Sequence, residues 1–252
     1  MSQPRFGFKV NKNILIPMRD SVEISVDIYA PDVEGRFPAI LIYHPYRKDD
    51  FTIAYHTDLL EFFTSRGYVV IFADIRGTGG SSGSITDFFN LQETKDGHDI
   101  VEWIASQPWC DGNVGMTGQS YPGITSFLAA TERPPHLKAI IPIYGTVDKY
   151  TMLYPGGNMR TAFPGLINSF RMAIDFAPPA NRDAEGRWVQ VWEEHIAKNR
   201  PLNLSEMSHQ TDDEYHHESS MIRKAANIDA ATFIIAGWHD TETAEPFQMY
   251  NS

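Results

Sequence analysis

Five short apolar runs dominate the hydrophobic pattern of this chain. They cover residues 39–43, 69–73, 114–116, 137–143 and 232–236. Continuous runs of this length are typical of strands that are buried on both faces of a parallel sheet. Helical candidates lie between them, at residues 57–66, 93–106 and 124–131. The alternation of strand and helix predicts an α/β fold with a wound, mostly parallel sheet.

Two stretches depart from this rhythm. Residues 9–17 and 22–29 alternate apolar and polar positions, which predicts an antiparallel hairpin at the start of the sheet. Residues 146–227 contain no strand-like run and are broken by prolines, and the stretch is too long for an ordinary surface loop. We therefore expect a helical cap at 146–227, inserted into a core formed by residues 1–145 and 228–252. A cap over the strand ends would shape a ligand pocket.

Composition narrows the class of partner. The formal net charge of −11 and the scattered basic residues disfavour a nucleic-acid or membrane surface. They favour a small molecule or short peptide and leave a homo-oligomer open. Residues 1–9 lack an apolar run of signal-peptide length, and no later run is long enough to span a membrane, so a cytoplasmic location is expected. Cys110 is the only cysteine, and we expect it to pack beside the entry of a strand.

Candidate chemistry centres on Gly118-Gln119-Ser120-Tyr121-Pro122-Gly123, between the apolar run 114–116 and the helical stretch 124–131. At a sharp strand-to-helix turn, closely spaced glycines let a serine adopt a strained backbone and expose its hydroxyl. The pattern indicates a serine hydrolase, although Pro122 stands where the usual motif has its last glycine. A serine that merely caps the helix is the alternative.

The segment 99–123 resembles the cocaine esterase and X-Pro dipeptidyl-peptidase family of α/β-hydrolase serine hydrolases, whose elbow has the form Gly-x-Ser-Tyr-x-Gly. Pro122 fits that form. Residues 44–48 (HPYRK), 73–79 (ADIRGTG) and 237–240 (GWHD) look like the family's oxyanion loop, glycine-rich turn and acid loop. The resemblance covers nearly the whole chain and implies an α/β-hydrolase core with an inserted cap.

This resemblance assigns roles to individual residues. Ser120 would be the nucleophile that forms an acyl-enzyme. The backbone N–H of Tyr121 and the phenol of Tyr46 would form the oxyanion hole. Asp240, which follows the 232–236 run, would be the triad acid, and Asp148 after the preceding strand is the alternative. No cofactor and no metal are implied.

The general base has no evident candidate. The chain order in this fold is serine, acid, then histidine after a further strand. Residues 241–252 are too few for a crossover and that strand, so we expect the last strand of the core and the triad histidine to be absent from this sequence. His44 is the nearest histidine by topology, and a structural role is expected for it.

Two functional hypotheses follow. The first is a serine acyl hydrolase that cleaves an ester or an amide, and the second is a catalytically inactive, truncated domain. Within the first, esterase and X-Pro dipeptidyl-peptidase activities are both open, and the peptidase would need carboxylates for a substrate ammonium. Asp175, Glu193 and Glu194 are candidates. The acidic run 212–217 and the glycine-rich turn 77–83 are interpreted as a solvated surface and a structural turn rather than metal and phosphate sites.

Overall fold

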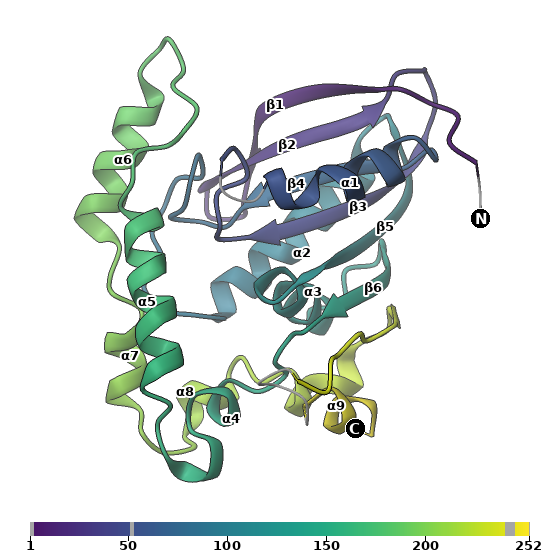
Figure 1. The fold of residues 1–252 in the computed structure, drawn as a ribbon. Coiled ribbons are helices and arrows are strands. Elements are labelled where there is room, and N and C mark those ends of the chain that lie inside the picture. Colours follow the sequence, from purple (N-terminus) through teal and green to yellow (C-terminus); the bar gives the residue numbers. More distant parts are fainter. Residues whose placement is uncertain (1–2, 51–52, 240–244, 252) are drawn as a thin grey trace.

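Seven strands form one twisted sheet in the computed structural model, which describes residues 3–50, 53–239 and 245–251 (Figure 1). The strand order is β1-β2-β4-β3-β5-β6-β7. The strands are β1 (Phe8–Pro17), β2 (Glu23–Pro31), β3 (Phe37–His44), β4 (Val69–Asp74), β5 (Cys110–Gln119), β6 (Leu137–Ile143) and β7 (Ala231–Thr232). The pairs β1–β2 and β2–β4 are antiparallel, and all later pairs are parallel. The predicted hairpin and the mostly parallel sheet are confirmed.

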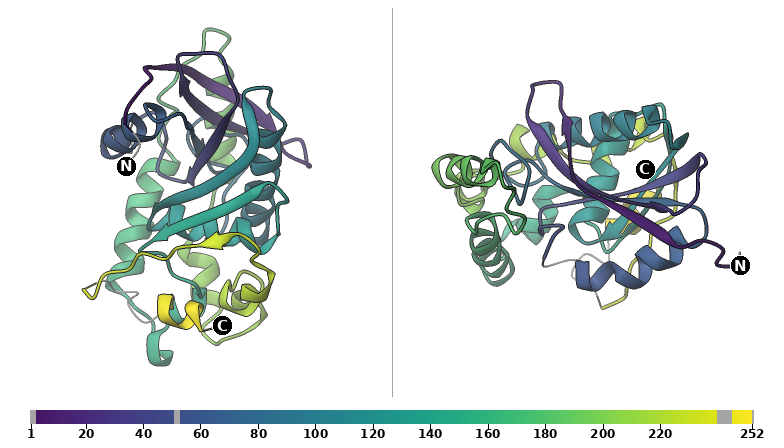
Figure 2. Two further views of the ribbon diagram at one scale, coloured as in Figure 1. Left: turned by 90° about the vertical axis from the view of Figure 1, so that its right-hand side faces the viewer. Right: turned by 90° about the horizontal axis from the view of Figure 1, so that it is seen from above.

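Helices cover both faces of the sheet. α1 (Ile53–Thr64) lies on one face, whereas α2 (Leu91–Ser106) and α3 (Tyr121–Thr131) lie on the other (Figure 2). Apolar side chains fill both layers, and Leu60 of α1 packs against Ile42 and Phe72 on its face. Continuous apolar strands form here because both of their faces are covered.

β5 is longer than its apolar run, and β7 is shorter than its run. β5 begins at Cys110, before the run starts, because Phe37 of β3 pairs with Cys110 in the sheet. Cys110 is fully buried at this strand entry, as expected, and burial raises the pKa of its thiol. β7 has only two residues, followed by an isolated bridge between Ile143 and Ile235. Pairing with β3 therefore adds polar residues to β5. Only Ala231 and Thr232 of β7 pair continuously with β6.

The described residues between β6 and β7 are helical or irregular. They contain α4 (Lys149–Leu153), η1 (Pro155–Gly157), α5 (Ala162–Asp175), α6 (Arg187–Lys198), α7 (Asn203–Ser208), α8 (Glu214–His217) and η2 (Ile222–Asn227). α5, α6 and α7 stand beyond the carboxyl ends of the central strands (Figures 1 and 2). We call these three helices the cap helices.

The far edge of the sheet is apolar. The outer side of β7 has no paired strand within the described ranges. Phe233 and Trp238 are strongly exposed there, and a groove of about 750 Å³ runs between β7, η2 and α9 (Glu245–Tyr250). This groove is lined mostly by apolar side chains, and no serine, cysteine or histidine is among its described lining residues.

Candidate active site

Ser120 occupies the turn between β5 and α3 in a conformation that few non-glycine residues adopt. Its φ is 65° and its ψ is −121°. Its backbone N–H donates to the carbonyl of Ile143 at 2.8 Å, which ties the turn to β6. The side chain is exposed and makes no capping hydrogen bond to α3, although Ser120 is the N-cap residue. This geometry favours an exposed nucleophile over a helix-capping serine.

Two glycines allow this turn to pack closely. Gly118 has φ +156°, and a Cβ there would lie 2.4 Å from Cβ of Pro122. A Cβ on Gly123 would lie 2.9 Å from the carbonyl oxygen of Gly118 and 3.1 Å from backbone atoms of Ile143. Real Cβ atoms do not approach backbone atoms so closely without a shift of the chain. The motif's glycines therefore hold α3 against β5 and β6.

Two hydrogen-bond donors lie beside Ser120. The phenol of Tyr46 lies near enough to the Ser120 side chain to influence the Tyr46 pKa, and its ring lies 6.0 Å from the ring of Tyr121. Burial raises the pKa of Tyr46, while the charge of Arg171 and the bond to Ser120 oppose that shift. Tyr121 is the first residue of α3, so its N–H has no partner within the helix. Both groups stand where the resemblance places oxyanion donors.

The loop that carries Tyr46 is fastened to the sheet by Lys48. The Lys48 ammonium is fully buried and lies 2.8 Å from oxygens of Asn13, Asp27 and Asp49. The Lys48 N–H donates to Asp74 at 2.7 Å, and Asp74 also accepts from Gly80 in the glycine-rich turn. Buried, hydrogen-bonded charges of this kind hold a backbone in one arrangement.

The same loop is also fastened to the cap. Arg47, whose φ is 63°, donates to the carbonyl of Pro178 at 2.7 Å and lies 3.5 Å from the carbonyl of Ile174 in α5. Tyr46 thus immediately precedes two residues that are anchored to different parts of the molecule.

A small cavity of about 50 Å³ lies next to Ser120. Its lining is mostly aromatic and aliphatic: Tyr46, Phe88, Phe89, Ser120, Tyr121, Ile124, Met152, Leu153, Ile167 and Glu206. Its lining comes from α3, α4, α5 and α7 and from the loops that follow β3, β4 and β5. A mostly apolar lining with a few polar groups is typical of small-molecule sites.

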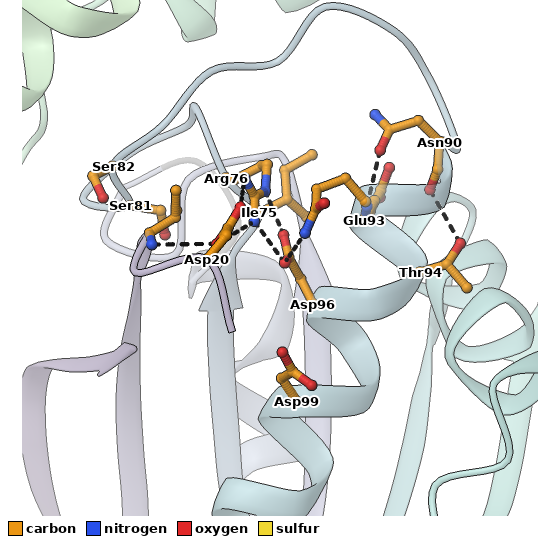
Figure 3. A network of polar contacts seen from close by, with 12 residues as sticks. Asp20, Ile75, Arg76, Ser81, Ser82, Asn90, Glu93, Thr94, Asp96 and Asp99 are labelled. Atoms are coloured by element: carbon orange, nitrogen blue, oxygen red, sulfur yellow. Dashed lines mark hydrogen bonds and ion pairs between the residues drawn. The ribbon is translucent and has the colours of Figure 1, made fainter. Parts of the chain in front are cut away.

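Polar contacts hold the glycine-rich turn and the start of α2 (Figure 3). Arg76 contacts Asp96 at 2.6 Å and Asp20 at 3.0 Å, and Ser81 donates to the carbonyl of Asp74 at 2.7 Å. The Asn90 side chain accepts from the N–H of Glu93 and caps α2. Backbone hydrogen bonds also form within residues 77–83. These contacts agree with the interpretation of the segment as a structural turn.

Glu93 is a fully buried carboxyl behind Tyr121. Oε2 accepts from the Tyr121 hydroxyl at 3.1 Å, whereas Oε1 has no hydrogen-bond partner in the described structure. Burial raises the pKa of Glu93 to about 8, with the Tyr121 bond and the charge of Arg171 lowering it. The carboxyl is therefore protonated at neutral pH and exchanges its proton near pH 8.

This pKa predicts a pH-dependent stability. Between about pH 4.5 and pH 8 the folded state keeps a proton on Glu93 that the unfolded state has released, so the free energy of unfolding falls as pH rises. Glu93→Gln removes this titration. We expect the variant to gain about 2–4 kcal/mol relative to the parent between pH 5 and pH 8.5, measured by urea unfolding at both values. Exposed Glu218→Gln is the control, and parallel pH curves for parent and Glu93→Gln would contradict the assignment.

The structure describes only one of the two candidate triad acids. Asp240 lies outside the described residues, so its role as triad acid stays a prediction. Asp148 caps α4, where its carboxylate accepts from the Thr151 N–H at 3.1 Å and from the Ser220 hydroxyl at 2.7 Å. These partners give the Asp148 carboxylate a local structural role.

No histidine side chain that the structure describes lines the Ser120 cavity. Nδ1 of His44 accepts from the N–H of Tyr46 at 3.1 Å, which is the structural role expected for it. His195 and His216 are buried and contact the carbonyls of Ser81 and His209. His217 pairs with Asp212 on the surface, and no group of metal-binding side chains is found among the described residues.

The carboxylates expected to meet a substrate ammonium lie elsewhere. Asp175 is buried, but it pairs with Arg171 at 2.9 Å on α5. Glu193 is exposed, and Glu194 binds the N–H of Gly83 and the Lys198 ammonium. None of the three lines the Ser120 cavity, whereas Glu206, which the sequence did not single out, does. Its position on a short cap helix gave no periodic signal.

A serine on a left-handed elbow at the carboxyl edge of a wound sheet, with a helical insertion above it, defines the α/β-hydrolase fold class. Comparison with known sequences is more specific. The chain belongs to the X-Pro dipeptidyl-peptidase family (S15 family), whose sequence profile matches residues 20–252. The resemblance found in the sequence is confirmed.

Individual relatives agree with this family. The chain is 31% identical to cocaine esterase of a Rhodococcus species over 268 aligned positions, which cover 97% of the chain and 46% of the relative. It is 31% identical to a putative serine esterase of Mycobacterium bovis, over 75% of the chain and 33% of that protein. The chain thus spans less than half the length of these relatives.

Solved structures show the same fold. A CocE/NonD family hydrolase from Staphylococcus aureus superposes with a TM-score of 0.80 at 23% identity, over 97% of the chain and 44% of the neighbour. An α-amino acid ester hydrolase gives a TM-score of 0.70 at 21% identity, over 97% of the chain and 46% of the neighbour. Within the described ranges, every helix is too short or too polar to cross a bilayer.

Proposed function

We propose that this chain carries the nucleophile and oxyanion hole of a serine hydrolase that cleaves a carboxylic ester or amide. Ser120 Oγ attacks the substrate carbonyl carbon, and the resulting oxyanion accepts hydrogen bonds from the Tyr121 N–H and the Tyr46 hydroxyl. The Ser120 hydroxyl proton passes to the triad base, which returns it to the departing leaving group as the acyl-enzyme forms. Water then hydrolyses the acyl-enzyme with the help of the same base. Asp240 is proposed as the acid that would orient the base.

One observation carries this proposal. The Ser120 hydroxyl makes no helix-capping hydrogen bond, and it lies beside the partly buried Tyr46 phenol in the lining of an apolar cavity. A structural serine at this position would bond to the N-terminal amides of α3. The relatives named as serine esterase and cocaine esterase support the same chemistry.

Covalent labelling tests the nucleophile. A fluorophosphonate probe should modify Ser120 when the chain is extended by a segment that supplies the triad histidine, detected by peptide mass mapping, and Ser120→Ala should abolish that label. Exposed Ser106 serves as an internal control that should stay unmodified. An unlabelled Ser120 in that folded, extended protein would refute the assignment.

The competing function is a domain that keeps the fold without turnover. The absence of a histidine from the cavity lining, among the described residues, favours it. Hydrolysis of p-nitrophenyl acetate separates the two, because turnover that Ser120→Ala abolishes requires a working base. Ser120 labelling without turnover would support the inactive domain.

A further inference from the structure

Arg171 of α5 is a cation that the folded chain buries completely. Its side chain is 1% exposed, and its hydrogen bonds run from Nη2 to the two carboxylate oxygens of Asp175, at 2.9 and 3.0 Å. Nε and Nη1 are buried and have no hydrogen-bond partner among the described residues. Burying a charge with unused donors costs stability, so the pair with Asp175 alone does not account for the position of this guanidinium.

The Arg171 guanidinium lies against the aromatic side chains next to Ser120. Its Cζ is 5.6 Å from the centroid of the Tyr121 ring. The Tyr121 ring lies 6.0 Å from the Tyr46 ring, which in turn lies 6.1 Å from Phe170, the residue before Arg171. Arg171 therefore belongs to the same aromatic cluster as the two residues that supply the proposed oxyanion donors.

The charges around Tyr46 favour a hydroxyl that gives up its hydrogen more readily. Burial raises the pKa of Tyr46, the charge of Arg171 is the strongest opposing influence, and Glu93 adds to the rise. Glu93 is protonated at neutral pH, so it adds little negative charge there. Asp175 binds only Nη2, which leaves the Nε and Nη1 side of the guanidinium without a counter-charge. In a buried site such a cation acts over several ångströms, because the effective dielectric constant is low.

We propose that Arg171 is a positioning residue of the oxyanion hole, whose buried charge polarises the Tyr46 hydroxyl and strengthens its hydrogen bond to the oxygen that becomes negative. It acts through Tyr46 and is not itself a substrate ligand. The cap helix α5 then contributes to the chemistry as well as covering it. This inference rests on the proposed function for its meaning in catalysis, but the effect of Arg171 on Tyr46 can be measured without turnover.

The acidity of the hydroxyl at position 46 provides the direct test in the 252-residue chain. Replacing Tyr46 with 3,5-difluorotyrosine lets ¹⁹F NMR follow the ionisation of this one phenol, because the fluorines bring it into the neutral range. Arg171→Met removes the cation and should lower the acid ionisation constant about 10-fold, whereas Asp175→Asn removes the counter-charge and should raise it about 3-fold. Arg171→Lys keeps the charge and should stay within about 3-fold of the parent.

The opposite directions of these effects separate charge from packing, because Arg171→Met and Asp175→Asn break the same ion pair. If Arg171→Met does not fold, Asp175→Asn still tests the sign. Arg133→Met is the matched control, since Arg133 is exposed just beyond the carboxyl end of α3, and it should leave the ionisation constant unchanged. An unchanged constant in folded Arg171→Met, or changes in the same direction in Arg171→Met and Asp175→Asn, would overturn the proposal.

Other groups near Tyr46 also titrate or carry charge. Burial raises the pKa values of Glu93 and Glu206 to about 8. The remaining groups come from α3 and from the loop of Tyr46 itself, and they are Tyr121, His44 and Arg47. The titration is therefore repeated with Glu93→Gln and Glu206→Gln present in both proteins, where the difference made by Arg171→Met should persist. Its disappearance would assign the effect to those carboxyls and overturn the proposal.

A double-mutant cycle connects the charge to the reaction, in the chain extended by a segment that supplies the triad histidine. Arg171→Met should slow fluorophosphonate labelling of Ser120 about 10-fold, but less than about 2-fold when Tyr46→Phe is also present, because the polarised hydroxyl is then gone. Equal slowing in both backgrounds would give Arg171 a packing role and overturn the proposal. An unlabelled Ser120 with the ionisation difference intact would refute the nucleophile and leave the effect of Arg171 on Tyr46 standing.

Discussion

Tyr46→Phe should slow fluorophosphonate labelling of Ser120 by about 10²- to 10³-fold while leaving the fold intact. The variant removes only the Tyr46 hydroxyl, which the loop after β3 places beside Ser120. In the reaction that hydroxyl would donate to the oxygen that becomes negative, and a preorganised donor in a water-poor site contributes most when charge develops there. The measurement is the second-order labelling rate.

Tyr68→Phe is the matched control, because Tyr68 is partly exposed at the start of β4 and far along the strand from the elbow. It should label at the parent rate. Equal labelling rates for Tyr46→Phe and the parent would exclude Tyr46 from the oxyanion hole. A large loss of unfolding free energy would instead assign the residue a packing role.

Gly123→Ala should both destabilise the protein and misplace Ser120. The added methyl would lie 2.9 Å from the Gly118 carbonyl oxygen and 3.1 Å from backbone atoms of Ile143, so α3 must move away from the sheet. We expect a loss of about 1–3 kcal/mol in the free energy of unfolding. A shift near 1 Å at the nucleophile would also slow labelling by about 10²-fold.

Gly165→Ala in α5 provides the contrast, because a Cβ there meets nothing within 4 Å. It should leave labelling unchanged and stabilise the protein by up to about 1 kcal/mol, since alanine favours the helical backbone. Urea unfolding and labelling rates measured on both variants distinguish the outcomes. If Gly123→Ala and Gly165→Ala had the same unfolding free energy and labelling rate, close packing at Gly123 would not be needed to position Ser120.

Much of the core was accessible from sequence because burial on both faces produces continuous apolar strands. The elbow was equally visible, since its glycines and serine are adjacent in the chain. β5 was predicted too short because its first residues, Cys110 to Asn113, are mostly polar and join the sheet through pairing with β3. The hydrophobic pattern of a sequence does not show which polar residues form hydrogen bonds to a neighbouring strand.

The buried carboxyls were harder to predict. The Asn90-x-x-Glu93 spacing is a helix-start signature, so the position of Glu93 could have been found, although its burial behind Tyr121 could not. Asp175 was considered for substrate binding, yet its i,i+4 spacing from Arg171 already indicated a local pair. Glu206 lies on a six-residue helix without periodicity, and only the packing of α4, α5 and α7 brings it to the cavity.

The paired anchors of the oxyanion loop have a consequence for heat inactivation. Lys48 fixes the loop to the sheet, whereas Arg47 fixes it to the end of α5 and to Pro178. Cap segments with fewer buried apolar contacts open at lower temperatures than a central sheet. Once the α5 end detaches, the Tyr46 hydroxyl loses one of its two supports while the strands are still folded. Reactivity of Ser120 should therefore decline at a lower temperature than the cooperative melting of the sheet.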